Sequence, residues 1–251
     1  MKFKEYDFRK RKIKVEEILD NTDAVNEVNK FPKNDEEFTY TNGYKAWASA
    51  IFVDLRDSTS LFSDKNDVDV AKIIRGFTSE VIEILIKDTD DDMMEVGIRG
   101  DCVYAIYSTS TKADLYDVSY RASYINTYIK MLNKLLQDRH LPIITVGIGL
   151  AAEETLAVKA GRKSSGINNL VWIGESVAKA SKLSDLGNKN GIGPIVMSKI
   201  FYNNYIDIAM EKNEESKSWW YKKTDTSYGE FYHGDVIIVD FNKWVSDGMN
   251  S

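Results

Sequence analysis

The chain is poor in the residues that make disulfides and zinc sites, and it has no long apolar run. It holds a single cysteine, Cys102, so a disulfide framework is excluded and a reducing, cytoplasmic compartment is expected. Its two histidines have no cysteine or histidine neighbour at zinc-ligand spacing. The longest apolar region, residues 141–152, is shorter than the roughly 20 residues of a membrane span. The charged N-terminus does not resemble a signal peptide.

Charge excludes a further class of protein. The formal net charge of -6 argues against a nucleic-acid coat, and 43% hydrophobic with 29% charged residues is ordinary for a globular protein. We therefore expect no nucleic-acid partner and no membrane partner for the domain itself. Residues 1–14 are rich in Lys and Arg, which suits a basic arm that touches a membrane or nucleic acid. The pattern favours the alternative, a partly helical extension that packs on its own domain or on a partner subunit.

A carboxylate follows the most apolar stretch of the chain. Residues 45–55 predict a strand that is covered on both faces and ends at Asp54-Leu55. The next residues, Arg56-Asp57-Ser58-Thr59, predict a tight turn whose free N–H groups open a helix. A strand tip of this kind suits a metal ion and a phosphate.

A second carboxylate lies in a predicted hairpin. Residues 95–107 predict two short strands that are joined at Arg99-Gly100-Asp101. Carboxylates from neighbouring strand ends can hold divalent cations through oxygen ligands, as magnesium requires. The pair Asp54 and Asp101 is therefore a candidate metal site, although neither motif is decisive alone.

The order of the predicted elements defines the fold class. The strand is followed by a helix over 68–87, the hairpin, a helix over about 112–139 and a strand over 143–150. This order predicts an α+β fold with a ferredoxin-like βαββαβ core. Further elements follow, with strands over 154–159, 169–173 and 194–197, helices over 174–183 and 198–210, and a terminal strand or hairpin over 231–241. We expect an N-terminal extension (1–43), a core domain (44–210) and a C-terminal extension (211–251) that packs on the core.

Together, the two carboxylate motifs resemble the catalytic domain of class III nucleotidyl cyclases. The resemblance implies that Asp54, Asp101 and the main-chain carbonyl of Leu55 hold two Mg²⁺ or Mn²⁺ ions per active site. It also implies that the backbone N–H groups of Arg56, Asp57, Ser58 and Thr59 bind the β- and γ-phosphates. Residues 172–183 are similar to the family segment Gly-x-x-Val-Asn-x-Ala-x-Arg, in which Asn orients the ribose and Arg stabilises the transition state. Here Ala178 and Lys182 stand at those positions, so Lys182 is the predicted catalytic cation and the ribose contact has no equivalent.

The base-reading positions depart from those of adenylate cyclases, which carry Lys and Asp or Thr. Gly97 and Val171 stand there, so ATP is not the expected substrate. Arg99, on the same strand face as Gly97, and Tyr44, just before the first strand, are candidates to read a smaller base. The segment Phe-Val-Asp-Leu-Arg-Asp-Ser-Thr resembles the Pycsar antiphage cyclases, which form cyclic UMP or cyclic CMP as second messengers. UTP is the expected substrate by that resemblance, with CTP left open.

Class III domains work as head-to-tail pairs, which implies a homodimer with sites at the subunit interface. In that arrangement Asp54 and Asp101 of one chain face Gly97, Arg99, Val171 and Lys182 of the other. Two alternatives stay open: a purine cyclase with an unorthodox pocket, and a degenerate cyclase that binds nucleotide without turnover. The missing Gly-Gly-Asp-Glu-Phe hairpin argues against a diguanylate cyclase.

Overall fold

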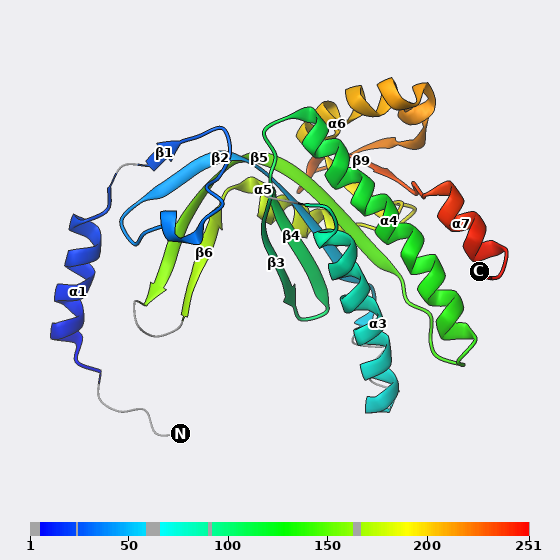
Figure 1. Ribbon diagram of the computed structural model, residues 1–251, viewed down its shortest axis with the longest axis horizontal. Helices are drawn as coiled ribbons and strands as arrows, with labels where there is room; N and C mark the ends of the chain where they lie inside the picture. The colour runs from blue at the N-terminus through cyan, green and yellow to red at the C-terminus, as the bar shows by residue number, and fades with distance from the viewer. Residues whose placement is uncertain (1–5, 24, 59–65, 90–91, 163–166, 251) are drawn as a thin grey trace.

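The computed structural model describes residues 6–23, 25–58, 66–89, 92–162 and 167–250. The strands of these residues form one nine-stranded sheet (Figure 1). Its main path runs β3-β4-β2-β5-β7-β9-β8, while β1 pairs with β2 and β6 pairs with β5. The strands are β1 (Val25–Glu27), β2 (Gly43–Leu55), β3 (Met93–Arg99), β4 (Cys102–Ser108), β5 (Val146–Arg162), β6 (Ile167–Ile173), β7 (Ile195–Ser198), β8 (Tyr221–Asp225) and β9 (Gly229–Gly234).

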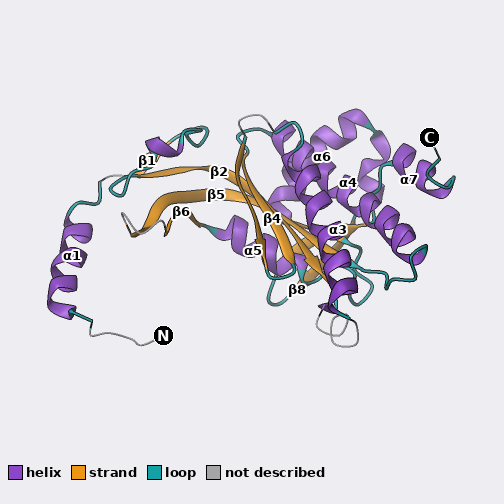
Figure 2. Cartoon of the chain, turned by 60° about the horizontal axis from the view of Figure 1, so that its bottom comes forward, coloured by secondary structure: helices purple, strands orange, loops and turns teal. Residues whose placement is uncertain are grey.

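Four of the helices pack on the two faces of this sheet. The helices are α1 (Phe8–Asp20), α3 (Asp67–Ile86), α4 (Lys112–Gln137), α5 (Glu175–Ser184), α6 (Lys199–Lys212) and α7 (Val239–Ser246), with short 3₁₀ turns at Asp35–Glu37 and Glu214–Trp219. Helices α3, α4 and α6 pack on one face (Figure 2), where Ile51, Val53 and Leu55 of β2 point into the main core. Helix α5 lies on the other face, where Ala180 joins Ala50 and Phe52 in a second core cluster.

The predicted α+β core is confirmed. In chain order β2, α3, β3, β4, α4 and β5 make the βαββαβ unit, and the strand order β3-β4-β2-β5 is that of a ferredoxin-like sheet. Strand β2 is antiparallel to both β4 and β5. Because side chains alternate along a strand, its nearly continuous apolar sequence is explained by burial on both faces.

Local sequence signals set the starts of the long helices. Asn66 caps α3 through the N–H of Asp69, and Thr111 caps α4 in a capping box with Asp114. Acidic side chains in the first turns of both helices favour the same ends through the helix dipole. These signals explain why both helices were predictable to within a few residues.

Two predictions about the later strands were wrong. The strands predicted over 143–150 and 154–159 are one 17-residue strand, β5. Residues 146–158 of β5 pair with β2 and residues 156–162 pair with β6, so no break separates the two predicted strands. The terminal strand predicted over 231–241 stops at Gly234, and α7 follows it. Its apolar residues pack on α4 instead of continuing a strand, since Val236 and Phe241 join the main core.

The N-terminal part of the chain lies away from the main body. The far halves of β2, β5 and β6 extend from the sheet, and β1 pairs with β2 along this extension (Figure 1). Helix α1 stands beyond β1, and none of its residues is buried by the described part of the chain. Among those described residues, no helix combines the length and apolarity that crossing a bilayer demands.

Candidate active site

Asp54 lies one residue before the end of β2, in a row of four residues across the sheet. Cross-strand pairing places Arg99 of β3 beside Cys102 of β4, Cys102 beside Asp54, and Asp54 beside Gly147 of β5. Residues paired in this way share a sheet face. This is the face that α5 covers, opposite to α3 and α4. The row therefore forms the floor of the candidate site.

The structure brings Asp54 and Asp101 together. Asp101 forms the turn between β3 and β4, directly before Cys102, the cross-strand partner of Asp54. Burial raises the pKa of Asp54 above its usual range; Arg56 lowers it, and the negative charges of Asp101 and Asp185 raise it further. The two carboxylates thus repel each other at the neighbouring ends of β2 and β4, as the predicted pair requires.

Cys102 takes no part as a nucleophile. Burial, followed by the charge of Asp54, raises the pKa of its thiol to about 12. A thiol with such a pKa stays protonated at neutral pH, and the thiolate is the reactive form. Its place beside Asp54 is therefore one of packing.

Arg56 has a role that the sequence did not indicate. Its side chain is 3% exposed, and its guanidinium forms an ion pair with Oδ2 of Asp54 and donates a hydrogen bond to the carbonyl of Asp185 at 2.8 Å. The side chain of Asp54 remains 22% exposed, so the carboxylate is still open on one side. Arg56 links the tip of β2 to the end of α5 and offsets part of the charge of Asp54.

The predicted phosphate role of the Arg56 N–H is wrong for this structure. That N–H donates to the carbonyl of Thr145 at 2.8 Å, continuing the pairing of β2 with the β5 side of the sheet. The turn follows at Asp57, whose φ of 54° is left-handed. Asp tolerates this conformation better than most residues, so position 57 does not need a glycine. Ser58 follows it, Leu55 ends β2 as predicted, and Thr59 lies outside the described residues.

Helix α5 is held close to the floor of the site by two glycines of β5. A Cβ atom at Gly149 would lie 2.0 Å from the carbonyl oxygen of Ala180, and one at Gly147 would lie 2.0 Å from that of Ser184. Only glycine permits this approach of strand and helix. It fixes the C-terminal end of α5, and Asp185 after it, beside Asp54 and Arg56.

Lys182 and Ala178 are exposed on α5, one turn apart. Lys182 stands in the last turn, and its amino group contacts neither Asp54 nor Asp101 among the described interactions of the chain. The structure therefore does not bring Lys182 to the carboxylate pair within one chain. Such an exposed position is the one that a two-chain site needs.

Gly97 lies directly against the side chain of a tyrosine on the neighbouring strand. It pairs with Tyr104 of β4, and a Cβ atom at Gly97 would lie 2.7 Å from the Tyr104 ring. The ring stacks on Phe52 with centroids 5.2 Å apart. A lysine at position 97, as in adenylate cyclases, would have to displace this ring from Phe52.

Glu95 lies two residues from the candidate Gly97, and sequence reasoning did not single it out. Tyr104 donates a hydrogen bond to Glu95 Oε1 at 2.5 Å, and the Trp172 indole donates to Oε2 at 2.7 Å. Burial, then the bond to Glu95, raises the pKa of Tyr104 to about 12, so its hydroxyl stays a donor. The only available signal was the position of Glu95, two residues before Gly97 on the same strand face. Glu95, Tyr104 and Trp172 together line the face that leads from Gly97 to β6.

The remaining base-reading candidates lie in different places. Arg99 ends β3 and is exposed, next to Asp101 in the hairpin, and Val171 of β6 is 41% exposed. Tyr44 lies within β2 and not before it, ten residues from Asp54, which is roughly 30 Å along a strand. Its ring packs edge-on against Phe38, and its hydroxyl lies 3.4 Å from the Glu37 carbonyl. Tyr44 therefore does not join Asp54 within one chain.

The donor set at the strand tip fits a divalent cation. In the described part of the chain no three His, Cys, Asp or Glu side chains gather as a metal cluster. Magnesium, however, is commonly held by one or two carboxylates together with water and substrate phosphates. The mutual repulsion of Asp54 and Asp101 is what such a cation relieves.

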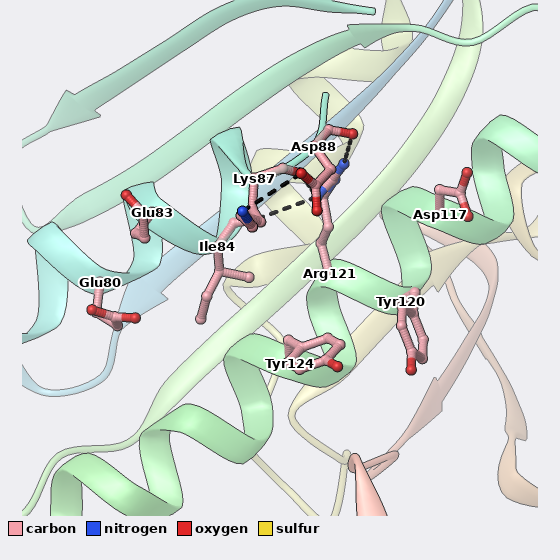
Figure 3. Close-up of a pocket in the computed structure, with 9 residues that line it drawn as sticks. All are labelled: Glu80, Glu83, Ile84, Lys87, Asp88, Asp117, Tyr120, Arg121 and Tyr124. Atoms are coloured by element: carbon pink, nitrogen blue, oxygen red, sulfur yellow. Dashed lines mark hydrogen bonds and ion pairs between the residues drawn. The ribbon is translucent and has the colours of Figure 1, made fainter. Parts of the chain in front are cut away.

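A separate groove lies on the opposite side of the sheet, between α3 and α4 (Figure 3). It measures about 610 Å³, and acidic side chains and two tyrosines line it. Arg121 crosses it to donate hydrogen bonds to the carbonyls of Ile84, Lys87 and Asp88, at 3.3, 2.6 and 3.3 Å. These bonds satisfy the C-terminal carbonyls of α3, so Arg121 has a structural role here.

Comparison with known proteins agrees with this geometry. No family model matches the chain. Among solved structures, a guanylyl cyclase, Cya2, superposes with a TM-score of 0.62 at 14% identity over 80% of this chain and 97% of that one. The adenylyl cyclase CyaB from P. aeruginosa gives 0.61 at 15% identity over 76% and 95%. These likenesses confirm the predicted fold, that of class III nucleotidyl cyclases.

Sequence relatives narrow the assignment. A uridylate cyclase of Treponema porcinum is 45% identical over 244 residues, which are 97% of this chain and 82% of that protein. Another, from Gulbenkiania mobilis, is 29% identical over 97% of both chains. The chain belongs to the uridylate cyclase family. This membership confirms the predicted class of enzyme, a nucleotide cyclase.

Proposed function

We propose that the protein converts UTP to 3′,5′-cyclic UMP and pyrophosphate, with two Mg²⁺ or Mn²⁺ ions held by Asp54, Asp101 and the carbonyl of Leu55. The observation that carries the proposal is the meeting of the two carboxylates at one sheet edge in a chain 45% identical to a uridylate cyclase. We place the activity in the cytoplasm, because a chain with one cysteine cannot form an internal disulfide and suits a reducing compartment.

The reaction is an in-line attack of the ribose 3′-hydroxyl on the α-phosphorus, with pyrophosphate as the leaving group. Bound divalent cations would acidify the hydroxyl and neutralise charge on the triphosphate. Asp54 and Asp101 must be ionised for this task, and Arg56 favours ionisation of Asp54. Lys182 would place positive charge near the α-phosphate, without the two-pronged geometry of an arginine.

The base pocket excludes a purine-reading lysine and offers a different set of polar groups. The Tyr104 ring fills the space beside Gly97, and Glu95 is held by Tyr104 and Trp172. Arg99, exposed at the end of the same strand, can donate to acceptor oxygens of a pyrimidine. These features support a uracil base over adenine, and Val171 lies on the strand that carries Trp172.

The exposed positions of Lys182 and Val171 support a site that two chains complete. We propose a head-to-tail homodimer in which Gly97, Arg99, Val171 and Lys182 of one chain face Asp54 and Asp101 of the other. The cyclic nucleotide would serve as a second messenger in antiviral defence, as in the Pycsar systems that the motifs resemble.

The test is a product assay with each of the four ribonucleoside triphosphates separately, and with UTP and CTP in competition, in the presence of Mn²⁺. Cyclic UMP as the main product supports the proposal. Cyclic CMP as the main product would reassign the base, and a purine cyclic nucleotide would contradict the pocket as described. Ala178 favours the alternative of a nucleotide-binding chain without turnover. The absence of any pyrophosphate release, with UTP bound, would establish that alternative.

A further inference from the structure

Helix α1 carries an apolar stripe that the described part of its own chain leaves uncovered. Phe8, Val15, Ile18 and Leu19 follow the helical repeat, and they are 66%, 49%, 59% and 71% exposed. The helix stands apart from the body in both overall views (Figures 1 and 2). An apolar stripe on a helix is normally buried against another element, so this one lacks its partner.

The charges of α1 are arranged against its own dipole. Its N-terminal half carries Arg9, Lys10, Arg11, Lys12 and Lys14, and its C-terminal half carries Glu16, Glu17 and Asp20. Apart from the N-cap Asp7, whose side chain accepts the Lys10 N–H, the first turn has no acidic residue, and the last turn has no basic one. Positive charge at a helix N-terminus and negative charge at its C-terminus are unfavourable. The Lys12–Glu16 pair at 2.5 Å also runs in the less favourable direction.

A helix of 13 residues with these charges gains little stability from its own sequence. Its stability must come from a partner that covers the stripe and sets negative charge beside the basic half of α1 and positive charge beside the acidic half. A second α1 in antiparallel orientation does both, since it sets the acidic half of each helix beside the basic half of the other. A parallel pair would instead place like charges side by side.

We propose that α1 binds the α1 helix of a second copy of this chain, antiparallel and about a two-fold axis. The apolar stripes then form the contact, flanked by the opposite charges of the two halves. This contact is distinct from the proposed nucleotide site, because α1 lies at the far end of β2 from Asp54. An anionic membrane suits the basic half and the stripe, but it would repel the acidic half.

Disulfide trapping tests the orientation in the full-length chain with Cys102→Ser. Arg11→Cys and Ile18→Cys lie on the same flank of the stripe, about 10 Å apart at 1.5 Å per residue. An antiparallel pair predicts that mild oxidation of a mixture links Cys at 11 to Cys at 18, at least about tenfold faster than either variant links to itself. Lys10→Cys and Glu17→Cys, equally spaced on the opposite side of the helix, are the matched control and should link slowly.

Charge reversal gives a second measurement. Arg11→Glu with Lys12→Glu makes α1 acidic, and Glu16→Lys with Asp20→Lys makes it basic. Each variant alone should associate about tenfold or more weakly than the natural chain in sedimentation at low salt. An equimolar mixture should restore association, and raised salt should weaken that restored association.

Several outcomes would overturn the proposal. Faster linkage of each variant to itself would show a parallel pair, and equal linkage of the control would show random collision. Binding of the natural chain to phosphatidylserine vesicles, with no trapped pair in solution, would assign the stripe to a membrane. Cyclase activity is a separate readout: loss of pairing with activity retained would overturn this inference alone, and missing activity with pairing intact would affect only the proposed reaction.

Discussion

The two ends of strand β2 are completed in different ways. At the Leu55 end, the chain supplies its own partners: Asp101 from the hairpin, Arg56 from the turn, and α5 pressed against Gly147 and Gly149. At the Gly43 end, β1 and the extended halves of β5 and β6 lead to an α1 helix that the described chain leaves uncovered. The proposed chemistry thus lies at the end with dense contacts inside one chain, and the proposed association lies at the end with few contacts.

The largest effect is expected from removal of either carboxylate. Asp54→Asn and Asp101→Asn should each lower kcat by about a thousandfold or more, because a neutral amide replaces a negatively charged carboxylate that is proposed to bind the cations. Purified variants are assayed for cyclic nucleotide and for Mn²⁺ binding. Asp207→Asn, on α6, is the matched control and should keep full activity. An active Asp101→Asn enzyme would contradict the two-carboxylate site.

The next effect is expected at the contact between β5 and α5. Gly149→Val places side-chain atoms against the Ala180 carbonyl and should cost about 1–3 kcal/mol of unfolding free energy, by overpacking. Displaced α5 should also lower activity. Gly76→Ala, in α3, meets only Leu132 Cδ1 at 3.3 Å and should leave stability unchanged or raise it by up to about 1 kcal/mol. Urea unfolding of both variants gives the comparison, and equal losses would argue against the close packing of α5.

A pH profile tests the charge balance at Asp54. Arg56 lowers the pKa of this carboxyl, so Arg56→Ala should raise it and move the acid limb of kcat/KM to higher pH. Lys189 also lowers the pKa of Asp54, but by less than Arg56 does. Lys189→Ala should therefore move the acid limb in the same direction by a smaller amount. Initial rates from pH 5 to 9 supply the limbs. A limb that moves to lower pH in Arg56→Ala would show that another group controls it.

A smaller effect is expected far from the site, in β9. Burial, then Lys223, lowers the pKa of His233, whose Nδ1 accepts the Gly193 N–H at 3.0 Å. Because the folded pKa lies below the unfolded one, this contribution to stability is present above about pH 6.5 and is lost as the pH falls. Between pH 7.5 and 5.5 the natural chain should lose more unfolding free energy than His233→Asn. A difference of opposite sign would contradict the direction of this pKa shift.

How much of this was predictable differs between the two ends of β2. The βαββαβ core, the hairpin at Asp101 and the meeting of two carboxylates followed from apolar runs, caps and motif spacing. The Arg56 ion pair and the Glu95 contacts did not, because they join residues through packing that no local pattern shows. Tyr44 was predicted to precede the first core strand but lies inside β2. The first residues of β2 pair with β1, and the sequence of β2 alone does not show that pairing. The length of β5 was missed because three strands, β2, β6 and β7, pair with different stretches of it.

The central claim is that Asp54 and Asp101 hold the cations against the substrate. The most direct measurement is a crystal structure of the protein with Mn²⁺ and 3′-deoxy-UTP, which cannot cyclise, recorded at a wavelength where manganese scatters anomalously. We predict two anomalous peaks within coordination distance of both carboxylates, with the triphosphate bound beside them. A bound nucleotide with manganese elsewhere, or with Arg56 still paired to Asp54 and no peak between the two aspartates, would contradict the account.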